Sequence, residues 1–196
     1  ADLFRSLPKA FVQCRACAHY CAVPEGGAGK CGVRRNLGGR LYLVTYGKAA
    51  GVPPHPLEHE TLSHSHAGDG APALPAVWIE YAHDTARLAK ARGMKNVFVT
   101  SGFETKEAWD YIRPHLDAAN VDLKGFTEKF YREVCGARLK PVLESLEHLV
   151  ATGVWVEVTT LLLEGYNDSD EEVRAMARFL KGLSPDIPWH LTAAHP

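Results

Sequence analysis

The chain has 196 residues, of which 46% are hydrophobic and 23% charged, and its formal net charge is -1. This length suits one compact domain with a small appendage. The near-neutral charge, without a basic block, argues against nucleic acid or an anionic membrane as the main partner, and no apolar run is long enough to span a bilayer. No signal peptide precedes the first strand-like stretch, so the expected location is the cytoplasm.

The first 47 residues form a cysteine- and glycine-rich segment with too few apolar residues for a core of its own. Four of the five cysteines lie here in the spacing C-x2-C-x3-C-x9-C, at Cys14, Cys17, Cys21 and Cys31. Four thiolates on a flexible, glycine-rich stretch can wrap a tetrahedral zinc ion or an iron–sulfur cluster. The alternative is free or disulfide-bonded thiols without metal, which is uncommon for clustered cysteines in the cytosol. Cys135 stands alone, and we expect it to be a small packing residue.

A strand and a long loop follow the cysteines. In residues 39–47, Leu41 and Leu43 alternate with tyrosine and valine, which predicts a strand. Residues 48–75 are rich in Gly, Pro, Ala and His and are expected to form a loop, although so long a loop is unusual inside a compact domain. The loop offers its histidines no helix to orient them, so we expect solvated side chains rather than metal ligands. These histidines are His55, His59, His64 and His66.

From residue 76 onward, patterns typical of helices and strands alternate. Thr105 is expected to cap the second helix, Asp168 and Glu171 to form a capping box before the last, and Asn167 to serve a turn or cap. The predicted helices cover residues 76–93, 105–116, 127–134, 140–153 and 167–183. The predicted strands cover residues 96–102, 119–126, 154–163 and 189–193.

Such βαβ units require a parallel sheet with right-handed crossovers. Four strands are too few to close an eight-stranded barrel, so we predict an α/β fold with an open sheet or a partial barrel. In either architecture, ligands bind beyond the C-terminal ends of the strands. This rule selects residues 100–102, Asp122 with Lys124, Thr159 with Thr160, and residues 190–195.

Several long segments, taken together, are similar to one family. In the first part the similarity is carried by "CRACAHYCAVPEGGAGKCGVRRNLGGRLYLVTYG". Later it is carried by "EYAHDTARLAKARGMKNVFVTSGF", "LDAANVDLKGFTEKFYREVCGARLKPVLESLEHL", "GVWVEVTTLLLEGYNDSDEEV" and "PDIPWHLTAAHP". The chain thus resembles the AmmeMemoRadiSam-system radical SAM enzymes, relatives of the activating enzymes of pyruvate formate-lyase. The resemblance implies a radical-SAM-type TIM barrel, a 4Fe–4S cluster, S-adenosylmethionine (SAM) and a protein substrate or partner.

The chain departs from this family at one motif. The family carries C-x3-C-x2-C after its first barrel strand, and those cysteines hold the 4Fe–4S cluster that binds SAM. Here the order in residues 14–21 is the opposite and matches the family's separate N-terminal cysteines, whereas "HETLSHSHAGDGAPALPAVW" stands at the place of the motif. We therefore predict a Cys-rich segment over residues 1–47, a loop at a deletion over 48–75, and a truncated barrel over 76–196.

Matching positions imply the cofactor contacts. Asp122 and Lys124 of "VDLK" are implied to contact the polar end of SAM, with Lys124 pairing with its carboxylate. His195 of "AHP" is implied on the same side. Without the resemblance, Asp122 and Lys124 form an ordinary salt bridge at a strand end, because side chains two residues apart on a strand face the same way. No catalytic residue is assigned.

Three functions remain open at this point. The first is a radical SAM family protein whose own radical chemistry is lost with the cluster motif. The second is a four-cysteine metal-binding scaffold or partner-binding protein without catalysis. In the third, the N-terminal cysteines act as the redox cluster, which requires residues 14–31 to lie beside Lys124. Loss of the first barrel strands also predicts an exposed edge at residues 97–99, and oligomerisation through it.

Overall fold

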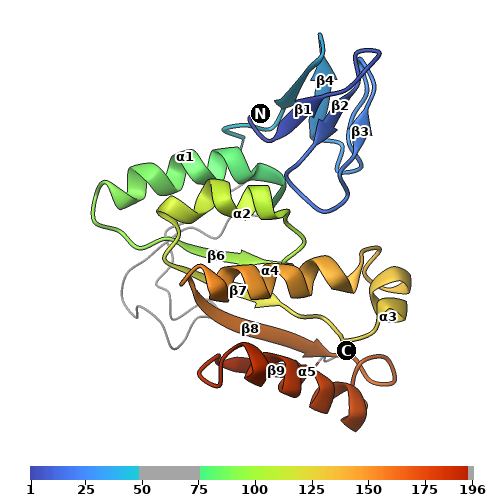
Figure 1. Cartoon of the computed structure of the whole chain (residues 1–196), viewed down its shortest axis with the longest axis vertical. Coiled ribbons are helices and arrows are strands. Elements are labelled where there is room, and N and C mark those ends of the chain that lie inside the picture. Colours follow the sequence, from blue (N-terminus) through green and yellow to red (C-terminus); the bar gives the residue numbers. More distant parts are fainter. Residues whose placement is uncertain (49–75, 194–196) are drawn as a thin grey trace.

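The computed structural model describes residues 1–48 and 76–193. It has two tiers, an N-terminal module of short antiparallel strands and a parallel sheet with helices beside it (Figure 1). The strands are β1 (Phe4–Ser6), β2 (Val12–Cys14), β3 (Ala22–Val23), β4 (Arg34–Leu37), β5 (Arg40–Leu43), β6 (Val97–Thr100), β7 (Ala118–Asp122), β8 (Trp155–Leu162) and β9 (Trp189–Ala193). The helices are η2 (Ala76–Trp78), α1 (Ile79–Lys90), α2 (Lys106–Ile112), η3 (Arg113–His115), α3 (Glu128–Glu133), α4 (Leu139–Ala151) and α5 (Asp170–Leu183).

The N-terminal module contains two small antiparallel sheets, one of β1, β2 and β3 and one of β4 and β5. In β5, Leu41 is 1% exposed and Tyr42 is 44% exposed, which confirms the predicted alternation although the strand is shorter than residues 39–47. The strands β1 to β4 were not expected. Each has only two to four residues, which is too short for a periodic pattern to stand out.

The module has no separate hydrophobic core. Its buried residues, among them Val12 and Leu41, belong to the same cluster as Ile79 of α1 and Trp109 of α2. The expectation that the first residues cannot build a core of their own is therefore confirmed. The buried side chains of the module are thus part of the larger core.

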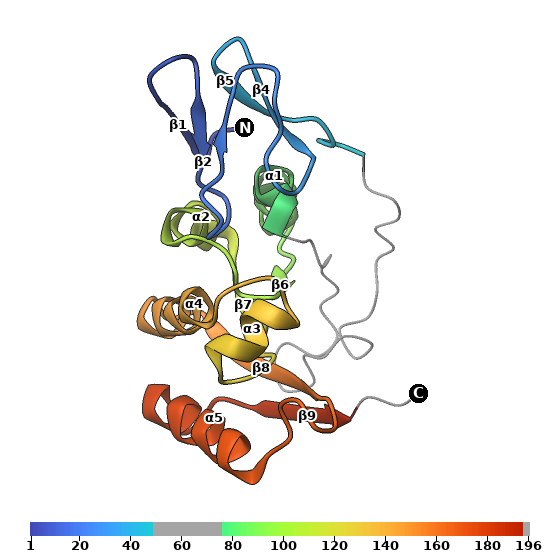
Figure 2. The ribbon, with the colours of Figure 1, turned by 90° about the vertical axis from the view of Figure 1, so that its right-hand side faces the viewer.

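The parallel sheet has the strand order β6-β7-β8-β9, which is also the chain order. The connecting helices α2, α4 and α5 lie on one face of it (Figure 2). Doubly wound sheets carry helices on both faces, whereas barrels carry them on the outside only. The arrangement is therefore that of a section of barrel wall, as the prediction of a partial barrel requires.

The helix-facing side of the sheet forms the core. Val121 and Val158 on this side are fully buried, as are Leu146 of α4 and Met176 of α5. Gly102, in the turn after β6, has φ +68°, and a Cβ on it would lie 2.7 Å from Val121 Cγ1. Glycine is therefore what allows this turn to pack directly against β7.

Of the two helix caps predicted from the sequence, the structure confirms one and contradicts the other. Thr105 caps α2, because its Oγ1 accepts from Ala108 N at 3.1 Å. The predicted capping box of Asp168 and Glu171 is wrong by one residue, since Ser169 Oγ accepts from Glu172 N at 3.3 Å. Asp168 Oδ1 instead accepts from Gly165 N in the preceding turn. The turn's own hydrogen bond therefore displaces the start of the helix.

The two edges of the sheet differ in exposure. No strand among the described residues pairs with the outer side of β6, and β5 pairs with β4 instead of covering it. Even so, Val97 and Phe98 of β6 are only 5% and 3% exposed, whereas Leu191 of β9 is 46% exposed. Oligomerisation through an edge stays a prediction. In the described part of the chain, none of the helices has the length and apolar character needed to cross a membrane.

Candidate functional site

The cysteines predicted to bind metal surround one hollow in the N-terminal module. Cys14 is buried, Cys17 and Cys21 are half-buried and Cys31 is exposed, and all four line the same pocket. Every cysteine of the chain is a free thiol, so the alternative without metal is reduced to free thiols. The fifth cysteine, Cys135, packs half-buried against the hydrophobic core, as expected of a packing residue.

Backbone N–H groups point at three of the four sulfurs. Such donors favour the thiolate form, because hydrogen bonds to the charged form stabilise it. Burial acts in the opposite direction and raises the pKa of the Cys17 thiol to about 11. The donor and acceptor pairs are Ala16 and Cys14, His19 and Cys17, and Lys30 and Cys21, with 3.4 Å between Lys30 N and Cys21 Sγ.

The four cysteine thiols are of the kind that binds metal, although their sulfurs are not arranged around one metal position in this structure. Within residues 1–48 and 76–193, no group of three or more His, Cys, Asp or Glu side chains is already gathered as a metal site. The same pocket is lined by Arg34, whose Nε is buried and has no hydrogen-bond partner among the described residues. Four thiols and a buried guanidinium N–H without an acceptor among the described residues, around one hollow, suit an anionic metal–thiolate centre.

The cysteine loop is docked on the segment that follows β6. Cys17 and Glu104 form an isolated antiparallel bridge, and Ala18 N donates to Phe103 O at 2.8 Å. The His19 ring lies edge-on to Phe103 with 5.0 Å between centroids. The cysteine loop therefore lies at the carboxyl edge of the parallel sheet, over its first described strand.

Glu104 is a buried carboxyl group that the sequence pattern did not single out. It is 2% exposed, and burial raises its pKa to about 7. Its Oε1 accepts from Thr100 Oγ1 at 2.5 Å, whereas Oε2 has no partner among the residues that the structure describes. No spacing in "SGFETKEAW" marks this residue, because its burial depends on the docked module.

Asp122 and Lys124 lie together at the carboxyl end of β7, as the strand periodicity predicted. Lys124 Nζ is 2.7 Å from Asp122 Oδ2, and the two side chains are 43% and 33% exposed. This is the salt bridge of the simpler interpretation. It is also a carboxylate and an ammonium, both accessible, that complement the ammonium and carboxylate of an amino acid.

The backbone of Lys124 is held from two sides. Tyr131 Oη accepts from Lys124 N at 3.1 Å, and Asn167 Nδ2 donates to Lys124 O at 2.6 Å and to Leu161 O at 2.9 Å. Asn167 is fully buried, so it joins the ends of β7 and β8 rather than serving only the turn expected for it. Burial raises the pKa of the nearby Cys135 thiol, and the positive charge of Lys124 opposes this shift in part.

The face of the sheet opposite the helices is polar. The register places Asp122, Thr159 and His190 in one row across three strands, and Asn120 with Glu157 in the row beneath. Paired residues of parallel strands point to the same face, so these side chains share one surface. Thr159 Oγ1 donates to Asn120 Oδ1 at 3.0 Å, which links the two rows.

Glu157 lies at the centre of hydrogen bonds on the inner face, which is the sheet face opposite the helices. It is fully buried, with Oε2 2.7 Å from His190 Nε2 and Oε1 accepting from Trp155 Nε1 at 3.2 Å. A buried, hydrogen-bonded carboxylate on this face is typical of a site and not of a core. Asn120 and Glu157 were missed, although polar residues at alternate positions of "ANVD" and "WVEVT" were the available signal.

Cavity size alone does not identify this site. A cavity of about 610 Å³ lies between α2 and α4, on the helix side, and its lining includes Trp109, Arg138 and Ser145 but neither Asp122 nor Lys124. The predicted contact His195, the histidines of the expected loop and nearly all of residues 48–75 lie outside the described residues.

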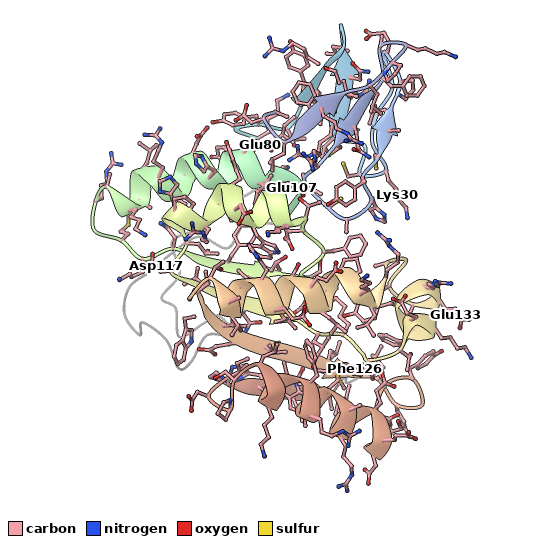
Figure 3. The ribbon with its side chains drawn as sticks, in the orientation of Figure 1. Lys30, Glu80, Glu107, Asp117, Phe126 and Glu133 are labelled. Atoms are coloured by element: carbon pink, nitrogen blue, oxygen red, sulfur yellow. The ribbon has the colours of Figure 1, made fainter. Side chains whose placement is uncertain are left out.

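Two separate parts of the molecule hold the Asp122–Lys124 pair and the cysteine quartet, which comprises Cys14, Cys17, Cys21 and Cys31. The described walls of the cysteine pocket come from residues 14–34 and Val77. In Figure 3, Lys30 of the cysteine loop and Phe126, two residues past Lys124, lie in different tiers of the molecule. The hypothesis that the quartet replaces the barrel cluster thus lacks its required proximity. With only Cys135 beside Lys124, the chain's cysteines do not fit a 4Fe–4S cluster there.

Known proteins are similar to this chain in sequence. The chain is 28% identical over 250 positions to the uncharacterized protein MJ0808 of Methanocaldococcus jannaschii, covering all of this chain and 74% of the relative. It is 24% identical to the isethionate sulfite-lyase activating enzyme of Oleidesulfovibrio alaskensis, covering 76% of this chain and 51% of that enzyme, so it spans about half the enzyme's length.

Comparisons of fold and family agree with this. A domain of the pyruvate-formate lyase-activating enzyme from Bacteroides vulgatus superposes with a TM-score of 0.50 at 18% identity, over 58% of this chain and 68% of that one. The fold is thus a partial barrel of that type. The family model of the radical SAM superfamily matches residues 60–180. With most of its length covered by that match, this chain belongs to the radical SAM superfamily.

Proposed function

We propose that this chain is a member of the superfamily that binds SAM at the Asp122–Lys124 pair, binds zinc or an iron–sulfur centre at its cysteine quartet, and does not itself generate a radical. The observation that carries the proposal is the accessible pair, 2.7 Å apart, at the carboxyl end of β7. Asp122 would receive the ammonium of SAM and Lys124 its carboxylate. The polar row through Thr159 and His190 continues from the pair across the inner face.

The absence of radical generation follows from the cysteines. When bound, the family's 4Fe–4S cluster supplies the electron that cleaves SAM. In this chain no C-x3-C-x2-C exists, and the quartet lies in the module rather than beside Lys124. The alignment with MJ0808 runs over 250 positions although this chain has 196 residues. That difference supports an internal deletion in this chain when it is compared with MJ0808.

We further propose a protein partner and a cytoplasmic location. The similar enzyme of Oleidesulfovibrio alaskensis is named for activating isethionate sulfite-lyase, and this likeness supports a protein as the partner here. A reducing cytoplasm would keep the five free thiols available for metal.

Calorimetric titration of the metal-reconstituted full chain with SAM tests the proposal. Asp122→Asn and Lys124→Met each remove one charge, and we expect each to weaken SAM binding about 10-fold or more, since hydrogen bonds to charged groups contribute about 1.5–3 kcal/mol. The matched controls are Glu128→Gln and Arg132→Met, which break the exposed 3.8 Å ion pair on α3. These controls should leave the affinity unchanged.

A second assay addresses catalysis. After addition of dithionite under anaerobic conditions, the wild-type chain should bind SAM yet release no 5′-deoxyadenosine. Formation of 5′-deoxyadenosine would refute the absence of radical generation. Metal binding without any SAM binding would favour the alternative of a four-cysteine scaffold.

A further inference from the structure

Arg34 is a buried cation between the cysteine pocket and the sheet tier. It lies on β4 and is 2% exposed. Its Nη1 and Nη2 donate to the two carboxylate oxygens of Glu80 on α1, at 2.8 and 2.5 Å, and Nη2 also donates to Val77 O at 3.1 Å. Figure 3 shows Glu80 at the boundary between the helices and the module. Glu80 therefore fixes the guanidinium by its outer two nitrogens.

The third guanidinium nitrogen is unsatisfied. Nε of Arg34 is buried and, in the described part of the chain, has no hydrogen-bond partner. Buried N–H groups without an acceptor are rare in native proteins and point to an unseen partner. Arg34 lines the cysteine pocket, and its charge acts on Cys14 and Cys31. Apart from the His19 ring, the side-chain acceptors that line this pocket are the four cysteine sulfurs.

The hollow itself is small. The pocket between the sulfurs has a volume of about 30 Å³, close to the share of liquid volume that one water molecule takes. That space has room for one metal ion. A zinc ion held by four thiolates has a tetrahedral, closed coordination sphere and a net charge of about -2.

We propose that the quartet holds a single zinc ion and that Arg34 is its positioning residue, donating Nε–H to a ligating thiolate and offsetting the negative charge of the centre. The inference rests on the proposed metal binding of the quartet and names the metal and its partner. Binding displaces the thiol protons to solvent as the zinc–sulfur bonds form. Glu80 orients the guanidinium but, by its charge, opposes an anionic centre.

Arg34 and Glu80 are thus expected to affect zinc affinity in opposite directions, and this difference can be tested. Zinc affinity is measured on the full chain by competition with a chromophoric chelator, with cobalt absorption reporting thiolate coordination. The double variant Arg34→Gln/Glu80→Gln removes both charges and leaves no buried charge unpaired. It should bind zinc about 10- to 100-fold more weakly, the usual effect of losing an outer-sphere partner. Glu80→Gln alone should bind zinc as tightly as the wild type or more tightly.

Two further variants complete the design. Arg35→Gln changes the neighbouring, exposed arginine on the same strand and should leave zinc affinity unchanged. Arg34→Lys keeps the charge but places no N–H at the position of Nε, and its affinity should fall between those of the wild type and the double variant. Because Arg34→Lys retains the partner of Glu80, it tests the inference even where the double variant fails to fold.

The outcomes distinguish metal binding by the four cysteines from the role of Arg34 beside the metal. A wild-type chain that takes up neither zinc nor iron with sulfide would refute metal binding by the quartet itself. Uptake of four irons with sulfide in preference to zinc would overturn the single-ion centre while leaving metal binding intact. Equal weakening by Glu80→Gln and by the double variant would mean that the ion pair is only structural, and would overturn the role of Arg34.

Discussion

The N-terminal module and the sheet tier are stabilised in different ways. The sheet tier has strands of four to eight residues and helices whose apolar stripes bury a continuous core. The module has strands of two to four residues and depends on polar anchors such as the buried Arg34–Glu80 pair. A short segment can thus hold a defined structure without its own core when it shares the core of a larger tier and is docked on it by polar contacts.

Besides the shared apolar core, hydrogen bonds between distant residues join the module to the sheet tier. Thr105 Oγ1 donates to Arg15 O at 2.5 Å, and Arg138 Nη2 donates to Ala18 O at 2.6 Å. Arg15 also forms an ion pair with Glu107. Because these contacts surround the cysteine loop, metal binding and docking are expected to support each other.

Metal removal should separate the two regions most strongly. Structural zinc sites contribute about 10–16 kcal/mol of apparent binding free energy, so a chelator should open the module. Hydrogen exchange is expected to show lost amide protection over residues 12–43 and retained protection in β7 and β8. Simultaneous loss of protection in both regions would show that they unfold as one unit and would break the comparison.

A substitution in the hydrophobic core should instead destabilise the sheet tier. Trp109→Ala removes a side chain that is 1% exposed and donates to Ser145 Oγ at 2.8 Å. We expect a loss of about 3–5 kcal/mol of unfolding free energy, measured by urea denaturation of the metal-loaded protein. Leu88→Ala, at a position 49% exposed, is the control and should change stability little. A similar loss in both variants would contradict the placement of the core.

Glu104 should make stability depend on pH at the junction of the two regions. Its folded-state pKa of about 7 exceeds its value of about 4.3 in an unfolded chain. The folded state therefore binds the proton more tightly, and this contribution to stability is lost as pH rises between those values. Relative to wild type, Glu104→Gln should gain on the order of 2 kcal/mol from pH 5 to pH 8. Parallel pH profiles would show that the carboxyl group is ionised throughout.

The smallest expected effect tests the start of α5. Ser169→Ala removes the cap that accepts from Glu172 N, which should lower stability by about 1 kcal/mol and the melting temperature by about 2–4 °C. Asp168→Ala is the matched control, because Asp168 bonds only to the preceding turn among the described contacts. A larger effect of Asp168→Ala would restore the capping box predicted from the sequence.

The local features were accessible from the sequence. Strand and helix alternation, the cap at Thr105 and the stripe through Leu146 depend on residues a few positions apart, so periodicity reveals them. The spacing of the cysteines and the shared face of Asp122 and Lys124 are local for the same reason. Burial of polar residues is less readable, because the same residue types also occupy exposed strand faces.

Tertiary structure decided the rest. Arg34 and Glu80 are 46 positions apart, and the row of Asp122, Thr159 and His190 exists only once three strands align in register. The docking of Cys17 against Glu104 likewise joins segments that no local pattern relates. Such pairings are chosen by the packing of the whole core, so the sequence by itself determined which elements and ligands exist, and only the tertiary structure decided which of them meet.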